Sequence, residues 1–462
     1  MKSLLHVSAV AVACGWAAPS NAQSDAGPDE AAVAQELAAM RAEMARMAAR
    51  IDTLEGQLDQ AQAKADNVTQ SAAVATQTAN TAAGKAEAGK GPAIAFKGAP
   101  EIKAEGGWSF KPRGRLQYDT GFVDAPDSTG RDDGWGSNVR RARLGVQGTM
   151  PGGFGYKFEV DVANSDVSVT DALISYEAGD LEVSVGQFNN FQSLEELTSS
   201  LHTSFIERAA FTDAFGFIRR VGVGAQYGKG DVLIQAGLFS DNMDALSNRN
   251  WSTDARVVFL PKLGDAQLHL GGSVHYRSYQ TGSTVRYRQR PLVAFTDERF
   301  INTGNLAANS ETGFGLEGAI ISGPFHAAAE AYWQKLDRPG ALADPDFFGG
   351  YAEVGYFLTK GDTRGYKAGV FDRVKPANPV GKGGMGSVQV NLRYDYLDLV
   401  DAGIVGGQQN GLYLALAWKP TDYTMLLANY GKLEYDDAVF AAANGDRSYG
   451  VDSFGLRAQI DF

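Results

Sequence analysis

The sequence predicts an all-β fold, a 16-stranded antiparallel transmembrane β-barrel preceded by an N-terminal α-helical coiled coil. Three observations support this prediction: apolar residues that recur every second position, short turns that alternate with long loops along the chain, and a heptad pattern near the N terminus. Mean hydropathy is −0.22. No run of about 18 apolar residues follows the N terminus, so we expect no membrane-spanning helix.

Residues 1–22 are typical of a secretory signal peptide, because Lys2 precedes an apolar core over 4–18 and small residues precede a cleavage site before Gln23. The only cysteine, Cys14, lies inside this segment. Its lipidation is the alternative, although the A-V-A before it is a poor match. A mature chain without thiols suits the oxidising periplasm.

Residues 30–84 are predicted to form a periplasmic coiled-coil helix, and residues 85–106, rich in Gly, Ala and Lys, a flexible linker. Four heptads flanked by Arg and Glu are typical of a coiled coil, in which copies of the chain meet. A lone amphipathic helix on a membrane is the alternative, disfavoured by the narrow apolar stripe and by flanks of mixed sign. The seam consists of Leu37, Met40, Met44, Met47, Ile51, Leu54, Leu58, Ala61, Ala65 and Val68.

Residues 107–462 are predicted to form the barrel. Segments such as R-G-R-L-Q-Y-D and Y-K-F-E-V-D-V alternate in polarity, and short breaks at Met150, Ala178, Gly228 and Lys262 are expected to be turns at one end. Longer connections are expected at the other end. They are 190–215, 241–250, 280–310, 337–347 and 434–449. About sixteen strands enclose an aqueous channel, so the predicted class is a porin.

The final segment alternates apolar residues with polar or small ones over about nine positions and ends on Phe462, as expected for a tilted strand that crosses a bilayer. A terminal Phe on such a strand resembles the signal that the barrel assembly machinery of the bacterial outer membrane reads. We therefore expect Phe462 to be an assembly signal. The expected location is the outer membrane, with lipids, lipopolysaccharide and the assembly machinery as partners and the N-terminal segment in the periplasm.

No chemistry-bearing motif stands out. H-E-x-x-H, G-x-S-x-G and Walker patterns are absent from the sequence, so we expect no enzyme and no cofactor. His269, His275 and His326 fall within strand patterns and are expected to be lumen or interface side chains rather than metal ligands. A formal net charge of −12 argues against nucleic-acid binding, but it does not forbid an anion path.

Arginine is the informative residue type. The period of two places Arg113 with Arg115, and Arg141 with Arg143, on shared strand faces, and the second pair should point into the lumen. Arg140 adjoins Arg141 and cannot face the same way in a regular strand, so it needs a bulge or the outer end of the strand.

A further strand begins with Arg219 and Arg220, and Arg286, Arg288 and Arg290 recur every second residue, as a row would. Guanidinium groups suit phosphate and carboxylate because they offer paired donors and keep their charge. Many porins also carry arginines opposite acidic residues to set a transverse field. Composition alone therefore leaves an anion-selective and a general porin open.

Several stretches resemble the phosphate- and polyphosphate-selective porin O and P family. They are F-K-P-R-G-R-L-Q-Y-D (110–119), V-R-R-A-R-L-G-V-Q-G (139–148), Y-K-F-E-V-D (156–161), V-G-Q-F (185–188), L-E-E-L-T-S-S (194–200), F-I-E-R-A (205–209), Y-F-L-T-K-G-D-T-R-G-Y (356–366), F-D-R-V-K-P (371–376) and L-R-A-Q-I-D-F (456–462). They occur in order from about residue 107 to the end, and the coiled coil lies outside the match.

This resemblance implies a homotrimer of 16-stranded barrels narrowed by inward-folded loops, in which small anions such as phosphate pass an arginine ladder and a constriction. The implied anion-path residues are Arg115, Arg140, Arg141, Arg143, Ser199, Ser200, Arg208, Arg286, Arg288 and Arg290, and Asp171 lies near the family's acidic residue. One departure is Glu196, because the family pattern has a lysine before its serine pair. At about 4 Å and an effective dielectric near 20, that reversal is worth several kcal/mol. Glu196 either pairs with a neighbouring Arg or points away.

We therefore expect an outer-membrane porin that prefers anions, phosphate foremost. Two alternatives stay open. One is a general or organic-solute porin, which is favoured by the carboxylate of Glu196 at the position where the family pattern has a lysine. The other is a barrel-anchored tether, in which the helix reaches a periplasmic or cell-wall partner.

Overall fold

The computed structural model describes residues 38, 41–42, 44–57, 59–60, 62–64, 66, 68, 70, 92–131, 134–163, 167–246 and 249–462. The chain divides into two units between Gly91 and Pro92, and each is described by itself. Within the described residues, no helix is both long and apolar enough to cross a membrane.

The N-terminal unit is helical at every described residue between 38 and 70. The seam residues Met44, Met47, Ile51 and Leu54 each expose more than half of their surface in the single chain. A helix at this place is as the sequence predicts, whereas its pairing with other copies stays a prediction. The predicted signal peptide lies outside the described residues.

A β-hairpin precedes the barrel where the sequence predicts a linker. Its strands are β1 (Ala93–Lys97) and β2 (Ala99–Lys103), and β2 continues onto the barrel through the pairing of Ile102 with Phe110. Gly98 allows the tight turn between the strands because its φ is 81°. The linker prediction is therefore wrong over these two strands, whose short alternating sequences favour pairing over a flexible chain.

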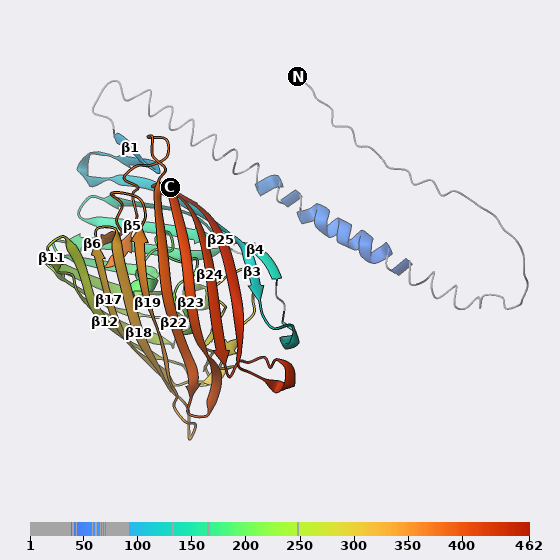
Figure 1. The fold of residues 1–462 in the computed structure, drawn as a ribbon. Coiled ribbons are helices and arrows are strands. Elements are labelled where there is room, and N and C mark those ends of the chain that lie inside the picture. Colours follow the sequence, from blue (N-terminus) through green and yellow to red (C-terminus); the bar gives the residue numbers. More distant parts are fainter. Residues whose placement is uncertain are drawn as a thin grey trace, which may run out of the picture. The chain divides into compact units, whose positions relative to one another are not determined.

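Sixteen strands of the described residues form the barrel (Figure 1). Each pairs antiparallel with the next, and the last pairs with the first, with Asp461 opposite Arg115, which closes the ring. The strands are β3 (Ser109–Asp124), β4 (Gly134–Met150), β5 (Phe154–Asp161), β6 (Ser168–Ala178), β7 (Leu181–Asn189), β8 (Arg219–Lys229), β9 (Val232–Phe239), β10 (Trp251–Phe259), β12 (Ala266–Ser278), β17 (Ser310–Ser322), β18 (Phe325–Asp337), β19 (Asp346–Phe357), β22 (Ser387–Asp401), β23 (Ile404–Thr421), β24 (Thr424–Asp436) and β25 (Tyr449–Asp461).

Shorter elements lie in the connections. They are the helices α2 (Leu194–Leu197) and α3 (Ala210–Ala214), the 3-10 turns η2 (Glu105–Gly107), η3 (Asp127–Thr129), η5 (Met243–Ala245) and η6 (Ala443–Gly445), and the short strands β11 (Lys262–Leu263), β13 (Thr284–Val285), β14 (Arg288–Gln289), β15 (Ile301–Asn302), β16 (Leu306–Ala307), β20 (Gly365–Lys367) and β21 (Val370–Asp372). The four predicted turns all fall at the barrel end that carries the C terminus and β1, and the five predicted loops all fall at the opposite end (Figure 1).

One connection at the turn end is long, and the sequence pattern did not indicate it. Residues 358–386, between β19 and β22, carry β20 and β21. The amide of Phe371 in β21 donates to Thr198 Oγ1 at 3.3 Å, and Arg364 donates to the carbonyl of His202. This turn-end segment therefore contacts the connection between β7 and β8, residues 190–218, which we call the inward loop.

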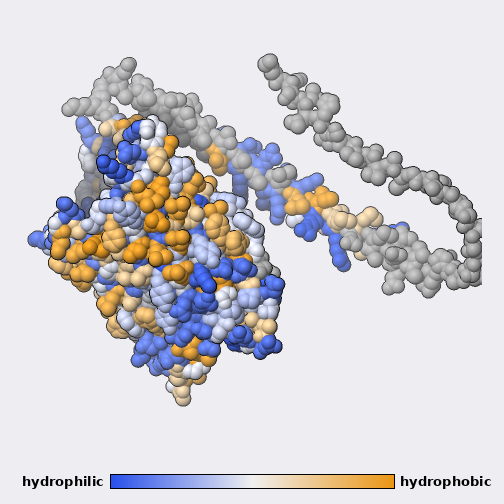
Figure 2. Space-filling view, in the orientation of Figure 1, coloured by the Kyte–Doolittle hydropathy of each residue, from blue (hydrophilic) through white to orange (hydrophobic). Residues whose placement is uncertain are grey.

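The outer face of the barrel carries the apolar half of each alternating strand. On β23, Leu412, Leu414 and Leu416 are exposed while Tyr413 and Ala415 between them are buried. Figure 2 shows apolar residues spread over the visible wall. An apolar outer face with a polar interior is the pattern that lipid requires of a barrel.

The terminal Phe462 lies on the seam where the barrel closes. Its backbone exchanges two hydrogen bonds with Gly114 of β3, at 3.0 and 3.2 Å. A Cβ at position 114 would collide with the Phe462 ring, so glycine is what lets the ring pack against this strand. This placement seals the last strand onto the first, and the assembly-signal role stays a prediction.

The apolar core occupies one side of the barrel interior. Most of its buried members come from the inward loop, from the 279–309 connection and from the wall strands β17, β18, β19, β22, β23, β24 and β25. The others are Val123 at the outer end of β3, Ala125, Phe371 of β21 and Ala438. Of the described residues, none on β4 through β12 belongs to this cluster. The interior beside β3 to β8 is therefore mostly polar, apart from a small apolar cluster of Phe188, Phe191 and Phe239 with Leu173 packed against it.

Candidate functional site

The inward loop is fixed to one wall by carboxylates. Glu330 on β18 accepts hydrogen bonds from the backbone amides of Leu194 (2.9 Å) and Glu195 (2.7 Å), where α2 begins. Asp395 on β22 accepts from the amide of Ala210, where α3 begins, at 3.0 Å. The first amides of a helix have no partner within it, so negative charge stabilises them. Two strands of the wall thus hold the two helices of the loop.

Arg393 on β22 joins the loop to the same wall by ion pairs. Its Nη2 lies 2.7 Å from Glu195 Oε1 and 2.5 Å from Glu353 Oε2. The guanidinium also lies over the rings of Phe205 and Tyr351, at 4.4 and 4.6 Å from their centroids. Removal of one partner would leave a buried charge uncompensated, which is costly. The cluster therefore fixes the position of the loop.

Aromatic packing completes this contact. The ring of Phe211 stacks on Tyr332 and Tyr351, at centroid distances of 5.8 and 6.4 Å, and Phe217 meets Tyr332 edge-on at 4.8 Å. Gly349 lies beneath Phe211, and a Cβ there would come within 2.5 Å of the Phe211 Cβ. Close packing of this kind holds the loop in one position, because a close-packed interior resists even small displacements.

The opposite face of the loop borders a cavity of about 290 Å³, which we call the inner cavity. Strands β3 to β8 and the loop supply its lining, which includes the hydroxyl residues Ser199 and Ser200. Among the described residues, seven cationic side chains and one carboxylate, Asp171, line it. The cations are Arg113, Arg115, Arg141, Arg143, Lys157, Arg208 and Arg219.

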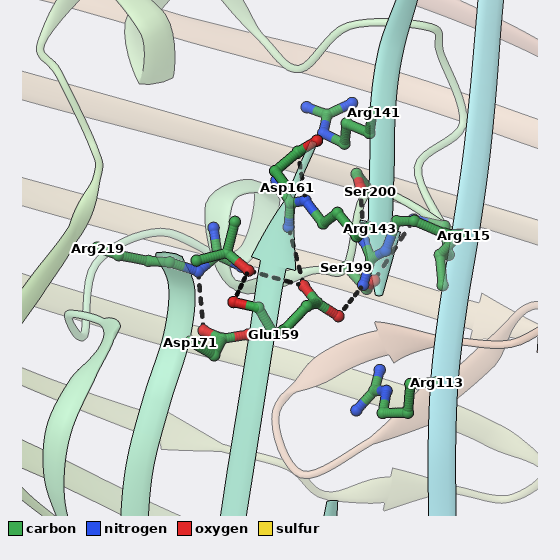
Figure 3. A network of polar contacts seen from close by, with 12 residues as sticks. Arg113, Arg115, Arg141, Arg143, Glu159, Asp161, Asp171, Ser199, Ser200 and Arg219 are labelled. Carbon is green, nitrogen blue, oxygen red and sulfur yellow. Dashed lines mark hydrogen bonds and ion pairs between the residues drawn. The ribbon is translucent and has the colours of Figure 1, made fainter. Parts of the chain in front are cut away.

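Glu159 on β5 connects the arginines of the first two strands (Figure 3). It lies 3.4 Å from Arg115 Nη2 and 3.2 Å from Arg143 Nη1, and Arg143 also reaches Asp161 at 2.8 Å. Arg115 donates in addition to Ser200 Oγ at 2.9 Å, which joins the wall to the inward loop. These contacts hold the guanidinium groups in place beside the cavity.

The remaining cations of the inner cavity are less fully balanced. Asp171 pairs with both Lys157 (2.6 Å) and Arg219 (2.8 Å). Arg113 and Arg141 bond to glutamine side chains and have no carboxylate within ion-pair distance among the described residues. Positive charge therefore exceeds negative charge around this space.

A second space, the middle cavity of about 320 Å³, adjoins the first and shares four arginines with it. Arg140 borders it from a β-bulge, because the pairing of β3 with β4 skips from Arg141 to Val139. Of the two alternatives that the sequence left open for Arg140, a bulge or the outer end of the strand, the structure shows the bulge. Arg140 forms two hydrogen bonds with Glu207 of the loop, at 2.7 and 2.9 Å.

The middle cavity contains more negative charge than the inner one. Its carboxylates are Glu196, Glu207, Asp213 and Asp244. Glu196 Oε2 lies 3.3 Å from Arg208 Nη1, so the sequence alternatives resolve in favour of pairing. Burial raises the pKa of Glu196 against the opposing charge of Arg208. Burial acts the same way on Glu207, but Arg140 prevails and holds the pKa of Glu207 well below its usual value.

A third space, the outer cavity of about 570 Å³, adjoins the middle one through shared residues that include Arg290. Arg286, Arg288 and Arg290 all border it, although only Arg288 lies in a strand, the two-residue β14. Arg286 donates to Asn302 at 2.9 Å and Arg290 pairs with Asp297 at 3.4 Å. Within the described chain, Arg288 has no ion-pair partner. The three cavities adjoin in succession through the barrel.

The structure brings most of the sequence-predicted site residues together. Arg115, Arg141, Arg143, Asp171, Ser199, Ser200 and Arg208 border the inner cavity, Arg140 and Glu196 the middle one, and Arg286, Arg288 and Arg290 the outer one. Their roles in transport stay predictions.

Sequence reasoning missed Lys157, Glu159, Gln117 and Glu207 as members of this network. The first two stand two residues apart in Y-K-F-E-V-D, so the period of two already placed them on one face. Gln117 donates to the carbonyl of Ser200 at 2.9 Å and carried no signal in its sequence context. Nor, across the residues described, does any group of three or more His, Cys, Asp or Glu stand ready to hold a metal ion.

Comparison with known proteins finds two curated relatives. An uncharacterized protein of Caulobacter vibrioides is 47% identical over 380 residues, which are 79% of this chain and 76% of that protein. Porin O of Pseudomonas aeruginosa is 28% identical over 415 residues, which are 78% of this chain and 92% of that protein.

Solved structures of low sequence identity also match. OmpT of Vibrio cholerae has a TM-score of 0.49 at 14% identity and covers 78% of this chain and 100% of its own. An anion-selective porin from Comamonas acidovorans has a TM-score of 0.48 at 13% identity and covers 77% of this chain and 100% of its own.

The family model described as phosphate-selective porin O and P matches residues 110–462, the whole of the barrel apart from its first residue. A porin is a passive channel of the outer membrane, so the predictions of that location and of a protein that is not an enzyme are confirmed. With most of its length matched by the family model, this chain belongs to the phosphate-selective porin O and P family.

Proposed function

We propose that this porin conducts small hydrophilic solutes passively and prefers anions, with phosphate and polyphosphate as the solutes that fit it best. The observation that carries the proposal is the lining of the inner cavity, in which seven cationic side chains face one carboxylate. A charged surface within low-dielectric walls raises the local concentration of counter-ions, and pore-lining charges set selectivity.

Phosphate fits the chemistry of this lining. Each guanidinium offers parallel N–H donors at the spacing of two phosphate oxygens, and it keeps its charge at any physiological pH. Arg141 is free of carboxylate partners among the described residues, and the hydroxyls of Ser199 and Ser200 add donors from the loop. Arg286, Arg288 and Arg290 would attract anions to the outer cavity before they reach this point.

Reversal potentials of single channels in planar bilayers, under a KCl gradient, test the proposal. We expect a potential of the sign set by chloride, and added phosphate should reduce the chloride current as it occupies the inner cavity. A reversal potential set by potassium, with no reduction of current by phosphate, would overturn the anion preference.

A general or organic-solute porin is the second candidate, and the pairing of Glu196 with Arg208 favours it. That contact neutralises one of the guanidinium groups around the inner cavity. The two candidates differ in one measurement, since a general porin passes chloride and phosphate according to size alone, without block.

Assembly is part of the proposal. A homotrimer with a three-chain coiled coil from the helical unit would bury the exposed seam of Met44, Met47, Ile51 and Leu54. If the helix instead tethers the barrel to a periplasmic or cell-wall partner, deletion of 30–84 would weaken the envelope and leave solute flux intact. If it joins three copies, the same deletion would lower the mass of the detergent-solubilised oligomer.

A further inference from the structure

Arg208 is the one cation of the inner cavity that lies on the inward loop, and its guanidinium is almost fully used by the loop itself. Its Nε donates to the carbonyl of Glu195 at 2.9 Å and its Nη2 to the carbonyl of Thr198 at 2.8 Å. Its remaining nitrogen, Nη1, faces the Glu196 carboxylate at 3.3 Å. The part of Arg208 that a solute could bind is therefore occupied by an oxyanion of the protein.

Glu196 makes fewer contacts than the three other carboxylates that hold cations beside the inner and middle cavities. Glu159 meets two arginines, Asp171 meets a lysine and an arginine, and Glu207 holds Arg140 through both oxygens. Among the residues that the structure describes, the Glu196 side chain has one ion-pair partner and no hydrogen-bond donor besides it. A single contact of 3.3 Å is a contact that a stronger anion can replace.

Residue 196 supports the structure of the loop through its backbone amide and not through its side chain. The Glu196 amide donates to Ser193 Oγ at 3.2 Å, which caps α2, while Glu330 accepts from the two preceding amides. Arg208 keeps two carbonyl partners whatever the Glu196 side chain does. The carboxylate can therefore leave Arg208 without loss of the loop's attachments.

The ion pair between Glu196 and Arg208 lies where the inner and middle cavities meet, so a displacement of the carboxylate would affect anion passage. Glu196 borders the middle cavity, whereas Arg208 borders both the middle and the inner cavity. An anion that passes between the two along the inward loop approaches Arg208 from the middle cavity, where the carboxylate lies. Carboxylate and phosphate oxygens compete for the same guanidinium donors.

We propose that Glu196 is a tethered competitor, which occupies the oxyanion position on Arg208 in the empty channel and is displaced by a phosphate that moves into the inner cavity. The inference rests on the proposed anion preference and adds a specificity-determining residue to it. Such a competitor weakens binding and so shortens the time that each anion spends in the channel. It also favours multiply charged oxyanions over chloride, because they displace a carboxylate more readily.

The test is the phosphate concentration that halves the chloride current through single channels of the full chain. Glu196→Gln keeps the size of the side chain and removes the competing charge, so the half-blocking concentration should fall about tenfold, as the gain of one charge-assisted hydrogen bond implies. The matched control is Asp244→Asn, because Asp244 borders the same cavity and forms no ion pair among the described residues. Its change should stay within about twofold, since exposed charges act weakly across water.

Equal block in wild type and Glu196→Gln would overturn the inference. So would an equal gain in both variants, because the effect would then be a general change of field. Reversal potentials of the same channels test the proposed function separately, since wild type can prove anion-selective while Glu196→Gln changes nothing. Discrete single-channel conductance steps in each variant show that its barrel has folded and inserted.

Discussion

The two faces of the inward loop differ in their chemistry. The face toward β18, β19 and β22 is packed with aromatic rings and closed ion pairs, as Phe211 on Tyr332 and Arg393 between Glu195 and Glu353 show. The face toward β3 to β8 borders open space in which cations outnumber carboxylates. The first face is a core, and the second is a surface that faces a solute.

The difference teaches how a loop can carry excess charge. Like charges around a small space repel, so the cation-rich face contributes little to the stability of the loop and opposes its closure. The packed face supplies what the other lacks, through apolar burial and through carboxylates that satisfy the first amides of α2 and α3. On the proposed function, stability and selectivity are thus assigned to different sides of one short segment.

Phe211→Ala should have the largest effect, because it disrupts the packed face of the inward loop. Phe211 is fully buried, and removal of such a ring costs about 3–5 kcal/mol in the free energy of unfolding. We expect an inward loop that no longer stays against its wall, with a larger single-channel conductance and a weaker anion preference. Unfolding in urea and conductance in planar bilayers measure the two effects.

Phe314→Ala is the matched control for this change. Phe314 on β17 is 51% exposed on the outer face of the barrel, so the same atoms are removed without touching the interior. Its conductance should equal that of wild type. An equal conductance in Phe211→Ala would show that the loop is held by its ion pairs alone.

The cation-rich face separates into balanced and unbalanced arginines, and two substitutions sharpen that distinction. Arg143→Gln removes ion pairs with Glu159 and Asp161 and leaves both carboxylates behind, so the free energy of unfolding should fall by about 3 kcal/mol. Arg141→Gln removes a bond to Gln117 alone, so stability should change by about 1 kcal/mol or less.

Both substitutions should lower the ratio of chloride to potassium permeability, and Arg143→Gln more so because it also exposes negative charge. Urea unfolding and reversal potentials give the two quantities. The distinction between balanced and unbalanced arginines is wrong if Arg141→Gln destabilises the barrel as much as Arg143→Gln does.

The sequence predicted the features that local pattern controls. The period of two identified the barrel and its lumen-facing arginines, and the adjacency of Arg140 and Arg141 required either the outer end of a strand or a bulge, of which the structure contains the bulge. The linker prediction failed over β1 and β2, because a composition rich in Gly and Ala hid two short alternating strands. Boundaries of short elements depend on pairing, which composition does not report.

Long-range contacts set the rest of the site. Nothing in the neighbourhood of Glu330 or Asp395 indicates that they hold the inward loop, more than a hundred residues away in the sequence. The contact of residues 358–386 with the loop was invisible for the same reason. Glu196 was readable as a reversed charge, but its pairing with Arg208 depends on the fold of the loop between them.

The smallest effect we predict is a pH dependence that compares the two carboxylates of the loop. Burial raises the pKa of Glu196, whereas Arg140 holds the pKa of Glu207 low, so acid neutralises Glu196 first. The Glu196 side chain carries its negative charge at pH values above the raised pKa and loses that charge as the pH falls below the pKa. Block of chloride current by sulfate, whose charge is constant in this range, should therefore strengthen several-fold toward mildly acidic pH, as the loss of one competing ion pair implies.

Charged groups near Glu196 decide how the result is interpreted. Arg208, Arg219 and Arg141 act on Glu196 as positive charges, and burial lowers the pKa of His202 to about 2, so that ring stays neutral throughout. Burial also raises the pKa of Asp213, which borders the same cavity and adds a slope of its own. Glu196→Gln should keep that slope and lose the larger part of the pH dependence. If the variant and wild type respond equally to acid, Asp213 rather than Glu196 controls the anion affinity of the channel.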